Sequence, residues 1–209
     1  MSAMLAQMQS LLAHINDAPV THDVSQFLVA RPECASTDEQ VLISVSNGGV
    51  ELGVYIDSAV LSRLHRSDPF QQLGHANLQD FCTALEGVSH FQYLVWCTEH
   101  ARTVSLLELE LQAEVDKYAA AMWLLLQQTR GEFPHRLHAR MFSQITFAPD
   151  LDQISLRRYQ EANRHAAYYC HALDQRYLRC RQRRIASWIL ELRSFYRCGH
   201  HTKMQRSIH

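Results

Sequence analysis

The first fifteen residues carry apolar side chains at helical spacing. These are Met4, Leu5, Met8, Leu11, Leu12 and Ile15. Residues three, four and seven apart share one face of a helix, so the pattern predicts an amphipathic helix. Two later segments, QVLISVS (40–46) and VELGVYID (50–57), are rich in β-branched residues and flank the turn-forming Asn47–Gly49. Asn and Gly accept the positive φ angles of tight turns, and we therefore expect a β-hairpin.

The next segments predict short helices and one more strand. Asp57 or Ser58 can cap a helix over SAVLSRLHR, and Asn77 can cap a second helix that Gly87 would end. The following HFQYLVWCT (90–98) is enriched in aromatic and β-branched residues, with apolar side chains at both alternating sets of positions. This composition favours a central strand, although a helix is the alternative.

From Ser105 onward the pattern is helical. Ser105 and Glu108 have the spacing of a capping box, and no glycine or proline follows before Gly131, which predicts a helix of about 25 residues. A short helix is expected over 134–142. Two further long helices are expected, one beginning at Asp152 or Ser155 and one over 183–197.

Strands early in the chain and long helices late predict an α+β fold. We expect a small antiparallel sheet of three to four strands with helices packed on it, followed by a mainly helical C-terminal half. The parts would be 1–104, with the hairpin around Asn47–Gly49, and 105–209, which together form one compact domain.

Charge is distributed very unevenly along the chain. Residues 1–154 hold 8 Lys or Arg against 18 Asp or Glu, and residues 155–209 hold 12 against 3, so that −10 and +9 give the net −1. Five arginines gather near an expected helix break: Arg176, Arg179, Arg181, Arg183 and Arg184. This basic end predicts docking on the acidic part of the same chain, or binding to an acidic protein surface or to a second copy.

Nucleic acid is an alternative partner for these arginines, because aromatic residues are interleaved with them and could stack on bases. We do not favour it. Trp188, Ile189 and Leu192 keep the helical spacing of a core, and the pI of about 6.9 is unlike that of most nucleic-acid-binding domains.

No apolar run approaches the roughly eighteen residues of a membrane helix, and the N-terminus lacks the basic start of a signal peptide. The six cysteines have no paired spacing, which is typical of buried thiols in a reducing compartment. We therefore expect a cytoplasmic protein that does not enter membranes.

The segment LELELQAEVDKY (107–118) brings four carboxylates into the first long helix. At 3.6 residues per turn, Leu111 and Val115 belong to its buried face, and Glu114 lies at the margin of that face. The polar side chains expected in solvent are Glu110, Gln112, Asp116 and Lys117.

Glu114 is a candidate for chemistry together with two Glu–His pairs. Glu161 and His165 are four residues apart in the second long helix, and Glu86 and His90 flank the predicted Gly87 turn. These five residues are metal ligand types, or could act as a general acid and base. The hypothesis requires Glu114 to approach His90 or His165.

No nucleophile or phosphate-binding motif specifies a reaction, and no cofactor is identified. Our leading interpretation is a binding protein that uses the arginine-rich helical surface. The alternative is an enzyme or metal-binding protein with a Glu/His pocket between the sheet and the two long helices.

Overall fold

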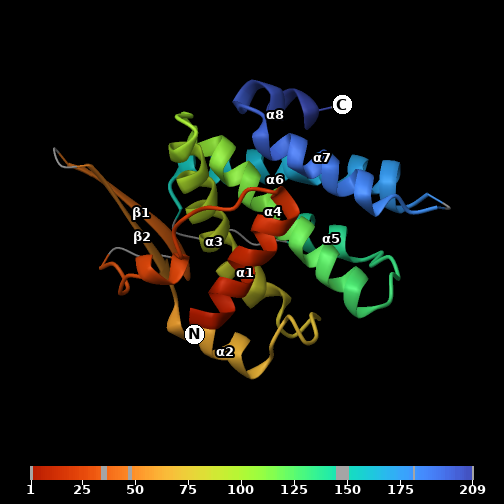
Figure 1. Ribbon diagram of the computed structural model, residues 1–209, viewed down its shortest axis with the longest axis horizontal. Coiled ribbons are helices and arrows are strands. Elements are labelled where there is room, and N and C mark those ends of the chain that lie inside the picture. Colours follow the sequence, from red (N-terminus) through yellow and green to blue (C-terminus); the bar gives the residue numbers. More distant parts are fainter. Residues whose placement is uncertain (1, 34–36, 47–48, 145–150, 181, 209) are drawn as a thin grey trace.

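The computed structural model describes residues 2–33, 37–46, 49–144, 151–180 and 182–208. A helix and a β-hairpin are followed by a series of helices (Figure 1). The elements are α1 (Ser2–Asn16), the 3-10 helix η1 (Val24–Phe27), β1 (Glu39–Ser46), β2 (Gly49–Ile56), α2 (Ser58–Arg66), α3 (Leu78–Glu99), α4 (Leu106–Gln128), α5 (Leu137–Phe142), α6 (Gln153–Leu173), the π-helical turn η2 (Asp174–Leu178), α7 (Ile185–Arg197) and α8 (His200–Arg206). The α+β class is confirmed, and helices predominate.

The sheet has two strands in the described residues, so the expectation of three to four strands is not met. β1 and β2 pair antiparallel, from Glu39 opposite Ile56 to Ser46 opposite Gly49. The predicted hairpin is therefore confirmed, although residues 47 and 48 of its turn lie outside the described residues. The hairpin extends from one side of the helical body, and its base packs on α3 (Figure 1).

The predicted strand over residues 90–98 is wrong, because this segment belongs to α3. The helix continues through Gly87, where we expected it to end. Phe91 and Tyr93 are fully buried, and so is the polar Ser89. A helix that is buried on nearly all sides loses the one-sided apolar period, which is why its aromatic composition resembled that of a central strand.

The long helix predicted from Ser105 is confirmed as α4, which packs against α1, α3, α5 and α6 (Figure 1). The Ser105 hydroxyl accepts a hydrogen bond from the Glu108 backbone N–H at 3.1 Å, as a capping residue should. The Glu108 carboxylate does not complete the capping box. It accepts instead from the hydroxyl of Tyr93 and from Arg102.

The C-terminal half contains the expected helices and one more. Asp152 caps α6 by accepting from two backbone N–H groups, and the π-helical turn η2 connects α6 toward α7. Beyond the predicted helices, His200–Arg206 form α8, which lies beside α7 (Figure 1). Lys203 of α8 is fully buried.

Buried apolar residues from both halves of the chain belong to one contiguous cluster, which includes Leu5 of α1, Val54 of β2, Tyr118 of α4 and Trp188 of α7. The division into 1–104 and 105–209 stays a prediction. All described cysteines have free thiols, and Cys97 and Cys170 are buried.

Candidate metal centre

Four polar side chains of α4 that were expected in solvent are buried. Glu110, Gln112, Asp116 and Lys117 are 7, 1, 1 and 8% exposed. The prediction was wrong because it assumed one packing partner, whereas α1, α3 and α6 surround this part of α4 (Figure 1). A buried charge is costly unless it is paired, so each of these groups must find a partner.

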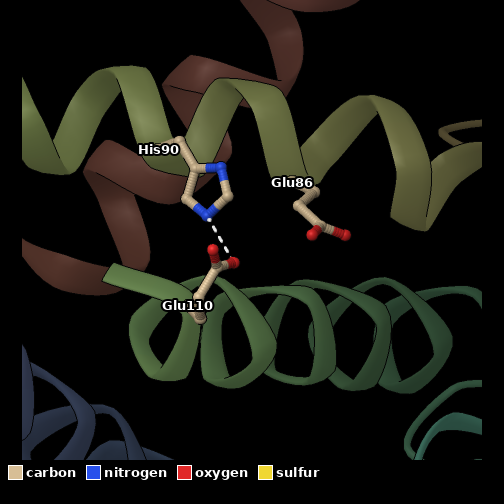
Figure 2. Close-up of side chains that lie close together, drawn as sticks. All are labelled: Glu86, His90 and Glu110. Atoms are coloured by element: carbon tan, nitrogen blue, oxygen red, sulfur yellow. Dashed lines mark ion pairs between the residues drawn. The ribbon is translucent and has the colours of Figure 1, made fainter. Parts of the chain in front are cut away.

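Glu86 and His90 meet Glu110 between α3 and α4. Glu86 and His90 are one turn apart on the unbroken α3, and not across a glycine turn as expected. Figure 2 shows the two carboxylates and the imidazole in the space between the helices. One ligand atom from each residue lies within 4.8 Å of the other two. His90 Nε2 and Glu110 Oε2 are 3.4 Å apart.

Glu39 of β1 approaches the other side of the His90 ring. Its Oε1 lies 3.6 Å from His90 Nδ1. This approach depends on Gly87, because a Cβ there would lie 3.0 Å from Glu39 Cγ and 3.2 Å from its Oε1. The glycine that we interpreted as a helix terminator thus allows the base of the hairpin to lie against α3.

Two further cations border the cluster. Lys117 donates to Glu86 Oε2 at 2.7 Å and to Glu114 Oε1 at 2.9 Å. Arg158 of α6 places its Nε 3.5 Å from Glu110 Oε1. Glu114 therefore lies next to the cluster, but its contact there is Lys117. In the part of the chain that the structure describes, Glu114 bonds to neither His90 nor His165, contrary to our hypothesis.

Several buried atoms at this cluster have no hydrogen-bond partner. They are His90 Nε2, Glu39 Oε1 and Arg158 Nε. His90 approaches Glu110 at 3.4 Å and Glu39 at 3.6 Å without forming a hydrogen bond to either carboxylate. Buried polar atoms are nearly always satisfied in proteins, so three such atoms on three elements set this cluster apart from an ordinary buried ion-pair network.

The electrostatics of the cluster are dominated by burial and by mutual attraction. Burial opposes charge on His90, but Glu110 and Glu39 outweigh it and raise the pKa of His90 well above its usual value. Burial likewise opposes charge on Lys117, but Glu114 and Glu86 raise its pKa. Burial raises the pKa of Glu39 despite the nearby His90. The cluster is a concentrated set of opposite charges shielded from water.

The second Glu–His pair is separate from this centre. Glu161 Oε1 lies 3.8 Å from His165 Nε2, and the Glu161 side chain is 47% exposed. His165 is buried and hydrogen-bonds to the Ser207 hydroxyl at 2.9 Å. This arrangement fixes the C-terminal end of α8 to α6. It brings together no third ligand within the described residues.

The arginine-rich segment is on the surface. Arg176, Arg179, Arg183 and Arg184 are exposed, and Arg181 lies outside the described residues. Arg176 and Arg184 each lie 5.3 Å from the centre of the Tyr177 ring. Other basic residues of residues 155–209 do pair with the acidic part of the chain, as Arg158 does with Glu110. Among described residues these four arginines form no ion pair with a carboxylate.

A second buried polar cluster, the Lys203 network, joins α8 to α3 and α4. Lys203 Nζ donates to the Tyr93 hydroxyl at 2.7 Å and to Gln112 Oε1. Tyr93 donates to Glu108 at 2.6 Å, and Gln112 donates to Asp116 at 2.8 Å. Burial outweighs the attraction of Glu108 and Asp116 and lowers the pKa of Lys203 to about 7.

No family model, curated protein or solved structure matches this chain. Within the described residues, every helix is too short or too polar to cross a bilayer. What the protein does must therefore be inferred from its own side chains.

Proposed function

We propose that the protein binds a divalent transition-metal ion through Glu86, His90 and Glu110. The observation that carries this proposal is the convergence of one imidazole and two carboxylates within 4.8 Å of one another, with His90 Nε2 buried and unpartnered. The N–O ligand set suits zinc, manganese, iron or cobalt, and the absence of sulfur from the three ligands disfavours a purely thiophilic ion.

The separation of the ligand atoms supports coordination. Two ligands that lie about 2.0–2.1 Å from a tetrahedral ion are roughly 3.4 Å apart. His90 Nε2 and Glu110 Oε2 have a separation of 3.4 Å. Glu86 is held by Lys117 through Oε2, and its other oxygen would be available as the third donor. Small side-chain shifts would complete the coordination, because the backbone of α3 and α4 already places the three residues.

The surroundings of His90 also support a metal ligand. A histidine that binds metal through one nitrogen usually donates its other N–H to a carboxylate or carbonyl, which fixes the tautomer and the ring orientation. Glu39 Oε1 lies 3.6 Å from His90 Nδ1 and has no other partner. We assign Glu39 as a positioning residue that would hold His90 with Nε2 directed at the ion.

The sequence also suggested an enzyme with a Glu/His pocket, and a metal ion in this centre could support catalysis. An ion with three protein ligands retains a position for water, and lowers the pKa of that water. Lys117 and Arg158 border the centre and would stabilise an anion beside the ion.

Metal analysis of protein purified without a histidine tag tests the proposal. After exposure to Zn²⁺, Mn²⁺, Fe²⁺ or Co²⁺ and gel filtration, we expect one ion per chain by mass spectrometry. His90→Ala and Glu110→Gln should each lower the affinity at least 100-fold. His201→Ala is the matched control, because this exposed histidine lies outside the centre. Equal binding by His90→Ala and the wild type would refute the centre.

The positioning role of Glu39 has its own test. Gly87→Ala would push the Glu39 carboxylate away from His90 without altering a ligand. We expect about tenfold weaker metal binding from this variant, comparable to the effect of Glu39→Gln. The Co²⁺ absorption spectrum should show whether the geometry at the ion changes. If Glu39→Gln leaves both the affinity and the spectrum unaltered, Glu39 has no positioning role.

A second candidate function is binding of an acidic protein surface, or of a second copy, by the arginine-rich surface. This surface is defined as Arg176, Arg179, Arg183 and Arg184. The supporting observation is that the four side chains are exposed and form no ion pair with a carboxylate in the described chain. The guanidinium groups of Arg176 and Arg184 lie over the Tyr177 ring, and that of Arg179 lies over the Phe133 ring. Held guanidinium groups can contact carboxylates with two hydrogen bonds each.

Sedimentation velocity and titration with poly-L-glutamate test this second candidate. Arg183→Glu combined with Arg184→Glu should abolish self-association or weaken poly-L-glutamate binding at least tenfold. Arg164→Glu, an exposed arginine of α6, is the control. Single-stranded DNA binding in the wild type, with no binding to poly-L-glutamate and no self-association, would instead favour nucleic acid.

A further inference from the structure

A cavity of about 290 Å³ lies between the segment before α3, the C-terminal half of α4 and α5, away from the metal centre. Its walls include Leu73, Leu78, Leu125 and Leu137. The volume is at the lower limit of small-molecule sites, which are usually concave, mostly apolar and about 300–1,000 Å³. A small ligand with an apolar body would fit these walls.

The wall formed by residues 67–77 is held rigidly. Gln128 of α4 accepts from the Leu73 backbone N–H at 2.8 Å and donates to the Pro69 carbonyl at 2.8 Å. Asn77 is 3% exposed, and it accepts from the Gly74 N–H and donates to the carbonyls of Ser67 and Gln72. Because this wall is already fixed, little further conformational entropy is lost when a ligand binds.

Two arginines line the same cavity. Arg136 precedes α5, and Arg140 follows it one turn later. Like charges four residues apart on a helix destabilise each other. Neither guanidinium forms an ion pair with a carboxylate in the described parts of the chain. An anionic group between them would relieve this repulsion, and a carboxylate matches the planar donor pattern of arginine.

Gly74 contributes open space to the cavity. A Cβ at this position would meet no atom within 4 Å. A larger side chain there could enter the cavity without a clash in the folded protein. This position therefore offers a way to fill the site from within.

We infer that this cavity is a binding site for a small carboxylate with an apolar body, such as a medium-chain fatty acid. The leucines would cover the hydrocarbon, and Arg136 and Arg140 would bind the carboxylate. The inference is independent of the metal centre and of the arginine-rich surface, since it uses none of their residues.

Calorimetric titration with sodium octanoate tests the inference. We expect saturable binding of one octanoate per chain with a Kd of roughly 0.1–1 mM. 1-Octanol and octylammonium should bind at least tenfold more weakly, because they lack the anionic group. An acidic peptide or octyl phosphate that binds in place of octanoate would overturn the assignment of a fatty carboxylate.

Two sets of variants locate the ligand. Gly74→Leu should abolish binding of octanoate and leave the thermal midpoint of unfolding unaltered or higher. Arg136→Gln combined with Arg140→Gln should weaken octanoate binding at least tenfold and leave weak octanol binding unchanged. Arg157→Gln combined with Arg164→Gln is the control for loss of charge, since both are exposed on α6. Octanoate binding that survives both Gly74→Leu and the Arg136 and Arg140 changes would place the ligand elsewhere and overturn the inference.

Discussion

Helices α3 and α4 carry two buried polar clusters that differ in how well their atoms are satisfied. In the Lys203 network, Asp116, Gln112, Lys203, Tyr93 and Glu108 form a continuous chain of hydrogen bonds. In the candidate metal centre, His90 Nε2 and Glu39 Oε1 are buried without a hydrogen-bond partner. Both clusters lie in the same helix pair, so burial alone does not distinguish them.

The difference indicates different roles. A buried network whose members are all satisfied stabilises one arrangement of the helices, because removal of any member leaves a partner unpaired. A cluster with unpartnered atoms costs stability, and such a cost is typical of functional sites. We therefore interpret the Lys203 network as structural and the centre as a ligand site.

Among the substitutions that test these different roles, replacement of Asp116 should have the largest effect on the free energy of unfolding. It accepts hydrogen bonds from Asn16, Ser89 and Gln112, all of them buried. Asp116→Ala should lower the free energy of unfolding by about 3–5 kcal/mol, because three donors lose their acceptor. Urea unfolding followed by circular dichroism measures the loss. Asp116→Asn keeps an acceptor and should cost less. A loss below about 1 kcal/mol for Asp116→Ala would show that the network is not structural.

The second largest expected effect is the pH dependence that Lys203 gives to the free energy of unfolding. Its folded pKa of about 7 is below the value of 10.5 expected for an unfolded lysine. Between these values the unfolded chain binds more protons, so the contribution of Lys203 to stability rises with pH from 7 and falls as pH decreases. The charged and ionisable groups that face Lys203 are Glu108, Asp116, Arg102, Cys97 and Tyr93.

This dependence is measured as the difference between the wild type and Lys203→Met. From pH 7 to 9.5 the free energy of unfolding of the wild type should rise relative to that of the variant by about 2–3 kcal/mol. Urea unfolding at fixed ionic strength gives both curves. Parallel curves would mean that Lys203 titrates normally, in conflict with its burial in the network.

The smallest effect on stability is expected at Glu39. Its substitution tests whether the candidate metal centre, unlike the Lys203 network, contributes to ligand binding and not to stability. Burial raises the pKa of Glu39, so its charge is already disfavoured in the fold. Glu39→Gln should change the free energy of unfolding of the metal-free protein by no more than about 1 kcal/mol, or increase it. The same change should weaken metal binding about tenfold. A large loss of stability with normal metal binding would reverse the roles of the two clusters.

Local patterns in the sequence were sufficient to predict the helices and strands that bury one face, and the helices that begin at a capping side chain. The 3.6-residue period of α1, the Ser105 cap of α4 and the Asp152 cap of α6 depend on residues close in sequence. The hairpin depended on two β-branched runs and a short turn. Glu86 and His90 could also be predicted as candidate metal ligands from the sequence, because the ability to bind a metal depends on residue type.

The tertiary structure decided which of these residues meet. Glu110 was assigned to solvent and Glu39 was not considered, because a one-dimensional pattern does not show that a helix has neighbours on several sides. Leu109 and Leu111 point about 160° apart around the helix axis and are both buried, and this spacing was a local signal that α4 is buried on more than one side. The approach of β1 to α3 at Gly87 joins residues 48 positions apart, and such contacts follow from packing and not from local preference.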